Sequence, residues 1–211
     1  MDAGYVDRWQ AGALLAGHLS GYAERPDTIV LGLVRGGVPV AAEVARRLTA
    51  PLDVLVIRKL GAPWAPELAF GALGPGGVRV LNESIAQSLK QRDIARVIAR
   101  ETAELNRQER LYRADREALD LTERTAIVVD DGLATGATAR AAVEVCRAMG
   151  AARVVVAVPV GSGDAIARLA PAADEVVCPL VPTDFGAVSR FYQDFRQVTD
   201  DEVRSILKPI S

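Results

Sequence analysis

The sequence predicts an α/β fold with a mostly parallel central sheet and flanking helices. Short runs of β-branched and apolar residues recur along the chain, separated by segments with apolar residues at helical intervals. Continuous apolar runs are typical of strands that are buried on both faces. Glycines and charged residues follow three of these runs. Ligands gather at the carboxyl ends of the strands in such sheets, so these positions are the candidate site.

The expected elements alternate after an opening helix at residues 6–20. Strands are expected at residues 28–33, 53–58, 125–129, 153–158 and 175–178. Helices are expected between them at residues 38–48, 139–149 and 164–169. Gly150 follows the second of these helices directly, as glycine commonly does at a helix end.

Two segments interrupt this alternation. Residues 61–77 hold many glycines and prolines and are too long for an ordinary connection, so we interpret them as a lid with a short hairpin around residues 67–73. Residues 82–115 have apolar positions at helical spacing and predict one long helix or two in succession. Their acids and bases are mixed, which favours a solvated helix face over a nucleic-acid arm.

Length and composition restrict the class of protein. The 211 residues fit one domain, with a core at about 28–180, a lid at about 60–80 and a tail at about 181–211. A net charge of -2 argues against a nucleic-acid partner. The sequence has no long apolar span and no signal-peptide pattern, so we expect a cytoplasmic protein with no membrane partner. Cys146 and Cys178 lack the spacing of a zinc site.

The most informative segment follows the apolar run at residues 126–129. Asp130 and Asp131 come next, and a loop rich in glycine and threonine then leads into a helix. The loop residues are Gly132, Leu133, Ala134, Thr135, Gly136, Ala137 and Thr138. Unpaired N–H groups and the positive end of the helix dipole favour a phosphate there. The two carboxylates, expected at an exposed strand edge, could accept hydrogen bonds from vicinal hydroxyls or hold waters of Mg²⁺.

The other two candidate sites follow the first two strands. Arg35, Gly36 and Gly37 could bind an anion through free N–H groups and one positive charge, or form an ordinary tight turn. Arg58 and Lys59 suit a ligand with several phosphates, although any solvated strand end can carry such a pair.

The segment at residues 127–138 resembles the motif of type I phosphoribosyltransferases that binds 5-phosphoribosyl 1-diphosphate (PRPP), where an apolar strand runs into two acids and a T-G-x-T loop. The layout around it is similar to the same family. Arg35, Gly36 and Gly37 match its pyrophosphate loop, which often holds a strained or cis peptide. Arg58 and Lys59 match a basic pair ahead of its flexible lid. The resemblance implies that fold, with a small hood from the terminal segments.

The resemblance also implies an activity, a Mg²⁺-dependent transfer of phosphoribose from PRPP to a nucleobase or related nitrogen acceptor with release of pyrophosphate. The loop amides would bind the 5-phosphate together with the hydroxyls of Thr135 and Thr138. Asp130 and Asp131 would hold the ribose hydroxyls and, through water and PRPP, the Mg²⁺ ion.

In this scheme Arg35, Arg58 and Lys59 would stabilise the departing pyrophosphate. The lid would exclude water, because PRPP is otherwise hydrolysed.

The acceptor is less defined. Ala134 stands where hypoxanthine-type enzymes have an aspartate, so the loop is closer to that of adenine enzymes. Glu67, with Phe70 and Gly71, loosely resembles their lid, or is a solvated carboxylate. The tail resembles a bacterial group of phosphoribosyltransferase-like proteins.

Phe191, Tyr192 and Phe195 in this tail either stack on a planar base or pin the tail to the core. A regulatory protein that senses PRPP or a nucleotide without turnover is the alternative function. We expect a homodimer, as in many relatives of this fold.

Overall fold

The computed structural model describes residues 4–114 and 116–208, with the backbone alone for residues 66 and 67. The helices are α1 (Arg8–Gly17), α2 (Gly37–Leu48), α3 (Glu83–Ala86), α4 (Gln91–Arg113), α5 (Ala137–Ala148), α6 (Gly163–Leu169) and α7 (Asp200–Leu207). The strands are β1 (Thr28–Leu33), β2 (Leu52–Leu55), β3 (Arg58–Ala62), β4 (Ala65–Leu73), β5 (Arg79–Leu81), β6 (Thr125–Val129), β7 (Arg153–Ala157) and β8 (Glu175–Val177).

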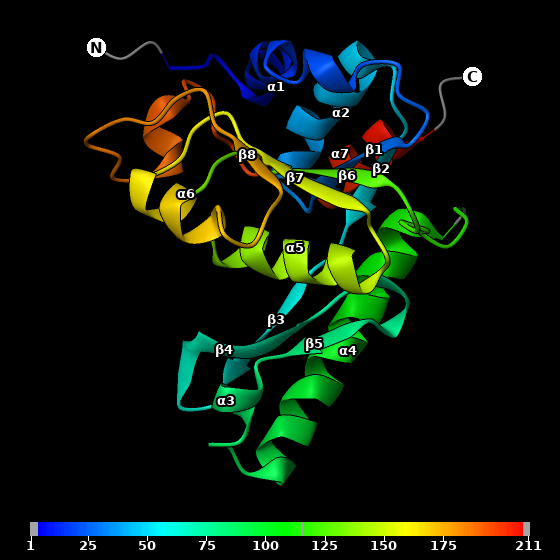
Figure 1. The fold of residues 1–211 in the computed structure, drawn as a ribbon, viewed down its shortest axis with the longest axis vertical. Coiled ribbons are helices and arrows are strands. Elements are labelled where there is room, and N and C mark those ends of the chain that lie inside the picture. The colour runs from blue at the N-terminus through cyan, green and yellow to red at the C-terminus, as the bar shows by residue number, and fades with distance from the viewer. Residues whose placement is uncertain (1–3, 115, 209–211) are drawn as a thin grey trace.

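A parallel sheet with strand order β2-β1-β6-β7-β8 forms the centre of the molecule (Figure 1). Every residue of β1 and of β6 is buried, which explains their unbroken runs of apolar and β-branched residues. The order changes direction between β1 and β6, because β2 lies on one side of β1 and the remaining strands lie on the other. In doubly wound sheets this switch point is where a ligand crevice opens. The expected fold class is confirmed.

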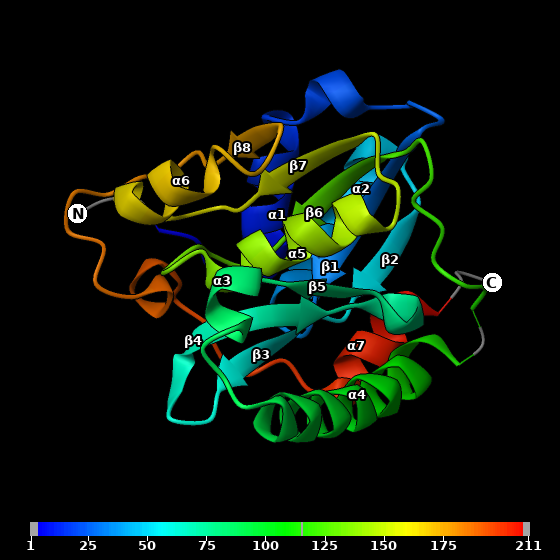
Figure 2. The same cartoon turned by 60° about the horizontal axis from the view of Figure 1, so that its bottom comes forward.

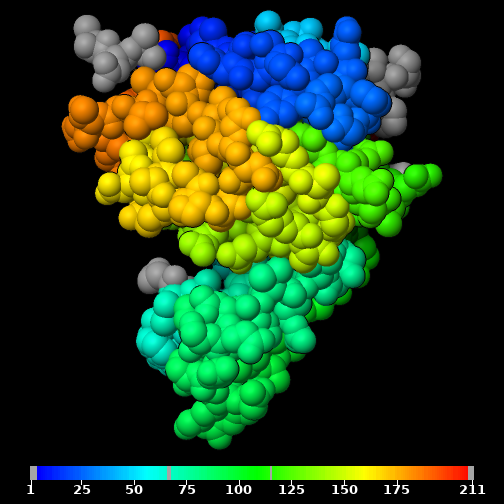
Figure 3. Space-filling view, viewed as in Figure 1, coloured from blue at the N-terminus to red at the C-terminus, as the bar shows by residue number. Residues whose placement is uncertain are grey.

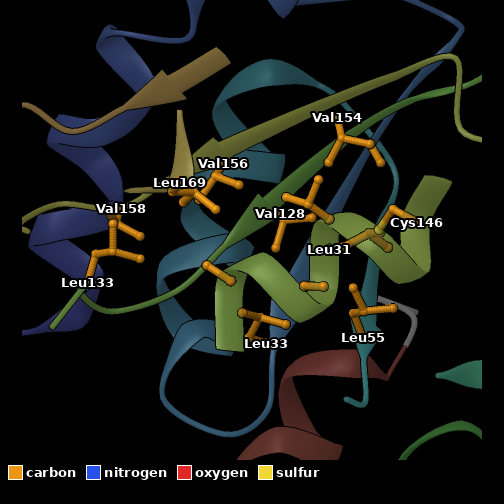
Figure 4. Packing of buried hydrophobic residues seen from close by; sticks show 14 of the residues in the cluster. Leu31, Leu33, Leu55, Val128, Leu133, Cys146, Val154, Val156, Val158 and Leu169 are labelled. Carbon is orange, nitrogen blue, oxygen red and sulfur yellow. The ribbon is translucent and has the colours of Figure 1, made fainter. Parts of the chain in front are cut away.

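Helices cover both faces of the central sheet. On one face, α1 and α2 pack against alternate strand residues such as Val30 and Ile127. On the other face, α5 and α6 pack against the residues between them, among them Leu31 and Val128. Figure 4 shows part of this second cluster, including Cys146 of α5. The sheet is therefore rigidly held behind the loops at its carboxyl edge.

A second, antiparallel sheet of β3, β4 and β5 forms a separate lobe with α3 and α4. In Figures 1 and 2, α5 lies between this sheet and the central one. Figure 3 shows the lobe projecting from the rest of the molecule. Leu60 and Phe70 are fully buried in it against Val97 and Leu105 of α4. The same cluster includes Val54 of β2 and Val203 of α7, so the lobe is packed onto the edge of the central sheet.

The second sheet corrects two expectations. The strand expected at residues 53–58 ends at Leu55, because its partner β1 ends at the opposite residue, Leu33. Arg58 instead pairs with Leu73 of β4. The segment at residues 61–77 is therefore largely sheet rather than a loop, and its hairpin starts well before residue 67. The expectation of one or two helices after it is confirmed by α3 and α4.

The helix α7 was not expected. Its start carries a capping box, in which Thr199 accepts a hydrogen bond from the amide of Glu202 and the Glu202 carboxylate accepts one from the amide of Thr199. The sequence T-D-D-E is a recognisable signal for such a box. None of the helices in residues 4–114 and 116–208 has the length and apolar character needed to cross a membrane.

Two glycines of α1 offer a matched test of the packing between α1 and α2. A Cβ at Gly12 would lie 2.6 Å from the carbonyl oxygen of Val40, whereas Gly17 has open space around it. We expect Gly12→Ala to lower the free energy of unfolding by about 1–3 kcal/mol through overpacking. Gly17→Ala, the control, should raise it by about 0.4–1 kcal/mol. Urea denaturation measures both, and equal effects would contradict this packing.

Candidate functional site

The loops that follow β1 and β6 are in direct contact at the switch point of the central sheet. A Cβ at Gly36 would overlap the carboxylate of Asp131, and one at Gly37 would overlap the carbonyl oxygen of Val129 and lie 2.9 Å from the Cα of Asp130. The peptide between Val34 and Arg35, which leads into this turn, is cis. The glycine pair is therefore needed for the close approach of the two loops.

Asp131 forms an ion pair that the sequence analysis missed. The Nε and Nη2 atoms of Arg8, in α1, lie 2.9 and 2.8 Å from its Oδ2. The two residues are 123 positions apart. The sequence has no local signal for such a contact, because only the packing of α1 against the sheet brings them together. The positive charge nearest to the acid pair thus comes from the start of the chain.

The acid pair is half-buried, and the Asp131 side chain is 16% exposed, which corrects the expectation of an exposed strand edge. Burial raises the pKa of Asp130, and the neighbouring charge of Asp131 raises it further. Burial also raises the pKa of Asp131, while Arg8 opposes this shift. One oxygen of Asp130 accepts the amide hydrogen of Asp131 at 2.9 Å. Half-buried carboxylates of this kind favour ligands that bring hydroxyl donors or a cation.

The loop after the acid pair is held in place by Leu133, and the three backbone amides that follow Leu133 have no hydrogen-bond partner among the described residues. Leu133 is 2% exposed, packs in the core and exchanges backbone hydrogen bonds with Val160 and Ser162. The next three amides, at residues 134–136, donate no hydrogen bond to any other residue in the described part of the chain. Gly136 has a φ of 78° and caps the start of α5. The open amides and the N-terminus of α5 can together receive an anion.

A cavity of about 620 Å³ extends from these loops to the second sheet and α4. Arg58 and Lys59 both line it, but they differ in their partners. Two nitrogens of Arg58 lie 2.9 and 2.7 Å from one carboxylate oxygen of Glu101, in α4. Lys59 is exposed and forms no ion pair with the described residues, and the same holds for Arg96, on the α4 wall. Arg100 also lines the cavity and shares Glu101 with Arg58, so the lining cations without an ion-pair partner among the described residues are Lys59 and Arg96.

Arg35 lies near the C-terminal helix. Its Nη1 is 3.5 Å from Oδ1 of Asp200, which also accepts the hydroxyl of Tyr112 at 2.6 Å. The contact is long and its side chain is 35% exposed, so the guanidinium is only loosely held.

The C-terminal aromatics mostly pin the tail to the core. Phe191 and Tyr192 are buried, and the Tyr192 hydroxyl donates to the backbone oxygen of Asp131 at 2.6 Å. The guanidinium of Arg8 lies 4.0 Å from the centre of the Phe195 ring. Phe185 is half-buried and stacks on Phe191 at 5.7 Å. Phe191 is buried and Phe195 faces Arg8, so Phe185 is the phenylalanine of this tail whose ring is partly exposed and has no charged partner.

The three residues that resemble the lid of adenine enzymes lie in β4 but have different surroundings. The backbone of Glu67 belongs to β4, and its side chain lies outside the described residues. Phe70 is fully buried in the second lobe, so its ring cannot stack on a ligand. Gly71 lies against the backbone oxygen of Val80, in the neighbouring strand, where a Cβ would overlap.

No side-chain cluster within the described ranges could hold a metal ion by itself, since none groups three or more His, Cys, Asp or Glu residues. Arg8 occupies Oδ2 of Asp131, whereas no side chain of the described residues pairs with Asp130, so Asp130 is the carboxylate with the fewer partners. A divalent cation here would need oxygens from a bound ligand or water, which fits the expected role of the acid pair.

Comparisons with known proteins identify relatives along nearly the whole chain. The family model described as phosphoribosyl transferase domain matches residues 8–196. A Mycobacterium tuberculosis (strain H37Rv) protein with the name "Putative phosphoribosyl transferase Rv0571c" is 51% identical over 205 residues, covering 96% of this chain and 46% of that protein. This chain thus spans about half the length of that relative. The crystal structure of TT1426 from Thermus thermophilus is 46% identical, covers 97% of each chain and has a TM-score of 0.90.

Proposed function

We propose, from the premise that the chain belongs to the phosphoribosyl transferase family, that it transfers phosphoribose from PRPP to a nucleobase or related nitrogen acceptor and releases pyrophosphate. One observation carries the proposal. The acid pair, the glycine turn and the open amides before α5 come together at the switch point of the sheet. Each suits a different part of PRPP, which combines a phosphate, a polyhydroxylated ring and a pyrophosphate.

The 5-phosphate would bind at the N-terminus of α5. The amides at residues 134–136 are open, and Thr135 and Thr138 add hydroxyls at the same place. Phosphate at a helix N-terminus gains both hydrogen bonds and a favourable dipole. Leu133 supports this position from the core and does not itself contact the ligand, because its side chain is buried.

The ribose hydroxyls would donate to the acid pair, with Asp130 as the principal acceptor. Its freer carboxylate could also hold waters of a Mg²⁺ ion whose other oxygens come from PRPP. That ion, when bound, neutralises negative charge on the pyrophosphate as it leaves. Burial of the acids strengthens their hydrogen bonds to hydroxyl groups and excludes competing water.

The pyrophosphate would leave toward the turn at residues 34–37 and the large cavity. Lys59 and Arg96 supply unpaired positive charge there, and Arg35 is loosely held at the edge. Arg58 acts mainly as a positioning residue, since Glu101 holds its guanidinium. Stabilising the charge that develops on a leaving group is a principal source of catalysis.

The acceptor would approach from the side opposite to the pyrophosphate. The turn at residues 34–37 follows β1, so the opposite side is that of β7 and β8. There Phe185 presents a partly open ring, and Val188 packs against Gly132 of the loop. An aromatic ring and an aliphatic side chain beside the acid pair suit a planar heterocycle.

Assembly as a homodimer and residence in the cytoplasm stay predictions.

The acid pair gives a direct test of this function. We expect the purified protein to bind PRPP in the presence of Mg²⁺ in isothermal titration, and to release pyrophosphate with at least one base of a panel. Asp130→Asn should weaken PRPP binding by roughly 10- to 100-fold, because an NH2 donor replaces one of the two oxygen acceptors offered to the ribose hydroxyls. Asp164→Asn, an exposed aspartate in the first turn of α6, is the control and should change nothing.

The outcomes of that test separate the functions. No PRPP binding by the unaltered protein would refute both the transferase and the sensor. Binding without pyrophosphate release for any base would leave the sensor as the correct function.

The cations of the large cavity give a second test. Lys59→Met should weaken the binding of pyrophosphate with Mg²⁺ by roughly tenfold, because it removes an unpaired positive charge from the cavity wall. Arg110→Met removes the same charge from an exposed position of α4 outside the cavity and serves as the control. Isothermal titration with pyrophosphate measures both variants. An equal effect of the two substitutions would show that Lys59 acts only through the overall charge.

A further inference from the structure

Arg8, in α1, contacts both the acid pair and the segment that precedes α7. It lies in the first turn of α1, and its Nη1 donates to the backbone oxygen of Arg196 at 2.8 Å. Its other two nitrogens contact Oδ2 of Asp131, and its guanidinium faces the ring of Phe195. The side chain is 9% exposed. All three nitrogens of this buried side chain and one face of its plane therefore have partners.

Asp131 is correspondingly occupied. Its Oδ2 is taken by Arg8, and its backbone oxygen accepts the hydroxyl of Tyr192 at 2.6 Å. Gly36 lies against the same carboxylate so closely that no Cβ could fit. The carboxylate is thus enclosed by α1, the C-terminal tail and the glycine turn. Oδ2 of Asp131 is therefore already engaged, whereas no side chain pairs with the carboxylate of Asp130 among the described residues.

Charge explains why such an enclosure is needed. Two adjacent half-buried carboxylates repel each other, and leaving both without a cation destabilises their charged forms. Arg8 compensates one of them within hydrogen-bond distance. Within the described part of the chain it is the cation that forms an ion pair with this acid pair. Asp130 is then left as the carboxyl group without a cationic partner among the described residues, and its environment can change when a ligand binds.

We infer that Arg8 is a positioning residue for PRPP binding, which fixes and neutralises Asp131 so that Asp130 alone receives the ribose hydroxyls. The inference rests on the proposed function and divides the roles of the two acids within it. It also links the site to the tail, because Phe195 and the Arg196 carbonyl hold the same guanidinium. An arginine suits this place, since a planar guanidinium can stack and donate in two directions at once.

A purely structural role would be the fastening of α1 to the tail. In that case the loss of Arg8 would lower stability, and the folded protein would bind PRPP normally. If Arg8 acts on PRPP binding through Asp131, the expected result is different. The effect of removing Arg8 must then depend on whether the Asp131 carboxylate is present.

A double-mutant cycle on the full chain tests this dependence. The variants are Arg8→Met, Asp131→Asn and the two combined, titrated with PRPP and Mg²⁺ and melted in parallel without ligand. We expect Arg8→Met to weaken PRPP binding about tenfold or more when Asp131 is present, and less than about twofold in the Asp131→Asn background. Arg8→Lys keeps the charge without the planar fork and should lie between Arg8→Met and the unaltered protein.

Arg113→Met is the matched control, because it breaks an equally buried arginine–carboxylate pair with Asp53 at 3.0 Å that lies outside the site. It should leave PRPP affinity unchanged. A lower melting temperature of Arg8→Met with unaltered affinity would overturn the inference, and so would equal effects of this substitution in both backgrounds. Failure of the unaltered protein to bind PRPP would refute the proposed function and, with it, this inference. Binding without coupling would refute the inference alone.

Discussion

The close approach of the Gly36–Gly37 backbone to Asp130 and Asp131 is the constraint on which the site depends. It brings a turn after β1 against the acids after β6, two strands that are neighbours in the sheet but lie far apart in the sequence. The approach crowds two half-buried carboxylates together, which creates the need for a compensating cation. Arg8 meets this need. The close approach of the two loops therefore depends on the packing of α1, which brings Arg8 to Asp131.

The second lobe has a different relation to the site. Its sheet and α4 pack in a hydrophobic cluster that also includes residues of β2 and α7, and the Arg58–Glu101 pair fixes the start of β3 on α4. The cavity wall that faces the loops is consequently formed by secondary structure on two sides. Cations placed on such a wall are held by packed elements. In the proposed reaction the lobe would both carry positive charge and limit the access of water.

The sequence predicts the central sheet well because burial on both faces leaves a clear apolar pattern in β1 and β6. It also locates the loop with open amides before α5, whose residues are contiguous. It fails where the outcome depends on contacts between distant segments. The pairing of Arg8 with Asp131 and of Arg58 with Glu101 has no local signature, and the strand β3 is set by its partner β4. The partners of single charged residues in the site therefore become visible only in the tertiary structure.

Hydrogen exchange of the backbone amides with and without PRPP and Mg²⁺ tests the central claim most directly. The account predicts slower exchange on PRPP binding at residues 134–136 and in the turn at residues 35–37, because the ligand would engage amides that are open at the first site and enclose the second. The amides of β8, far from both loops in the sheet order, should exchange as before. Binding of PRPP without protection of either loop would contradict the account.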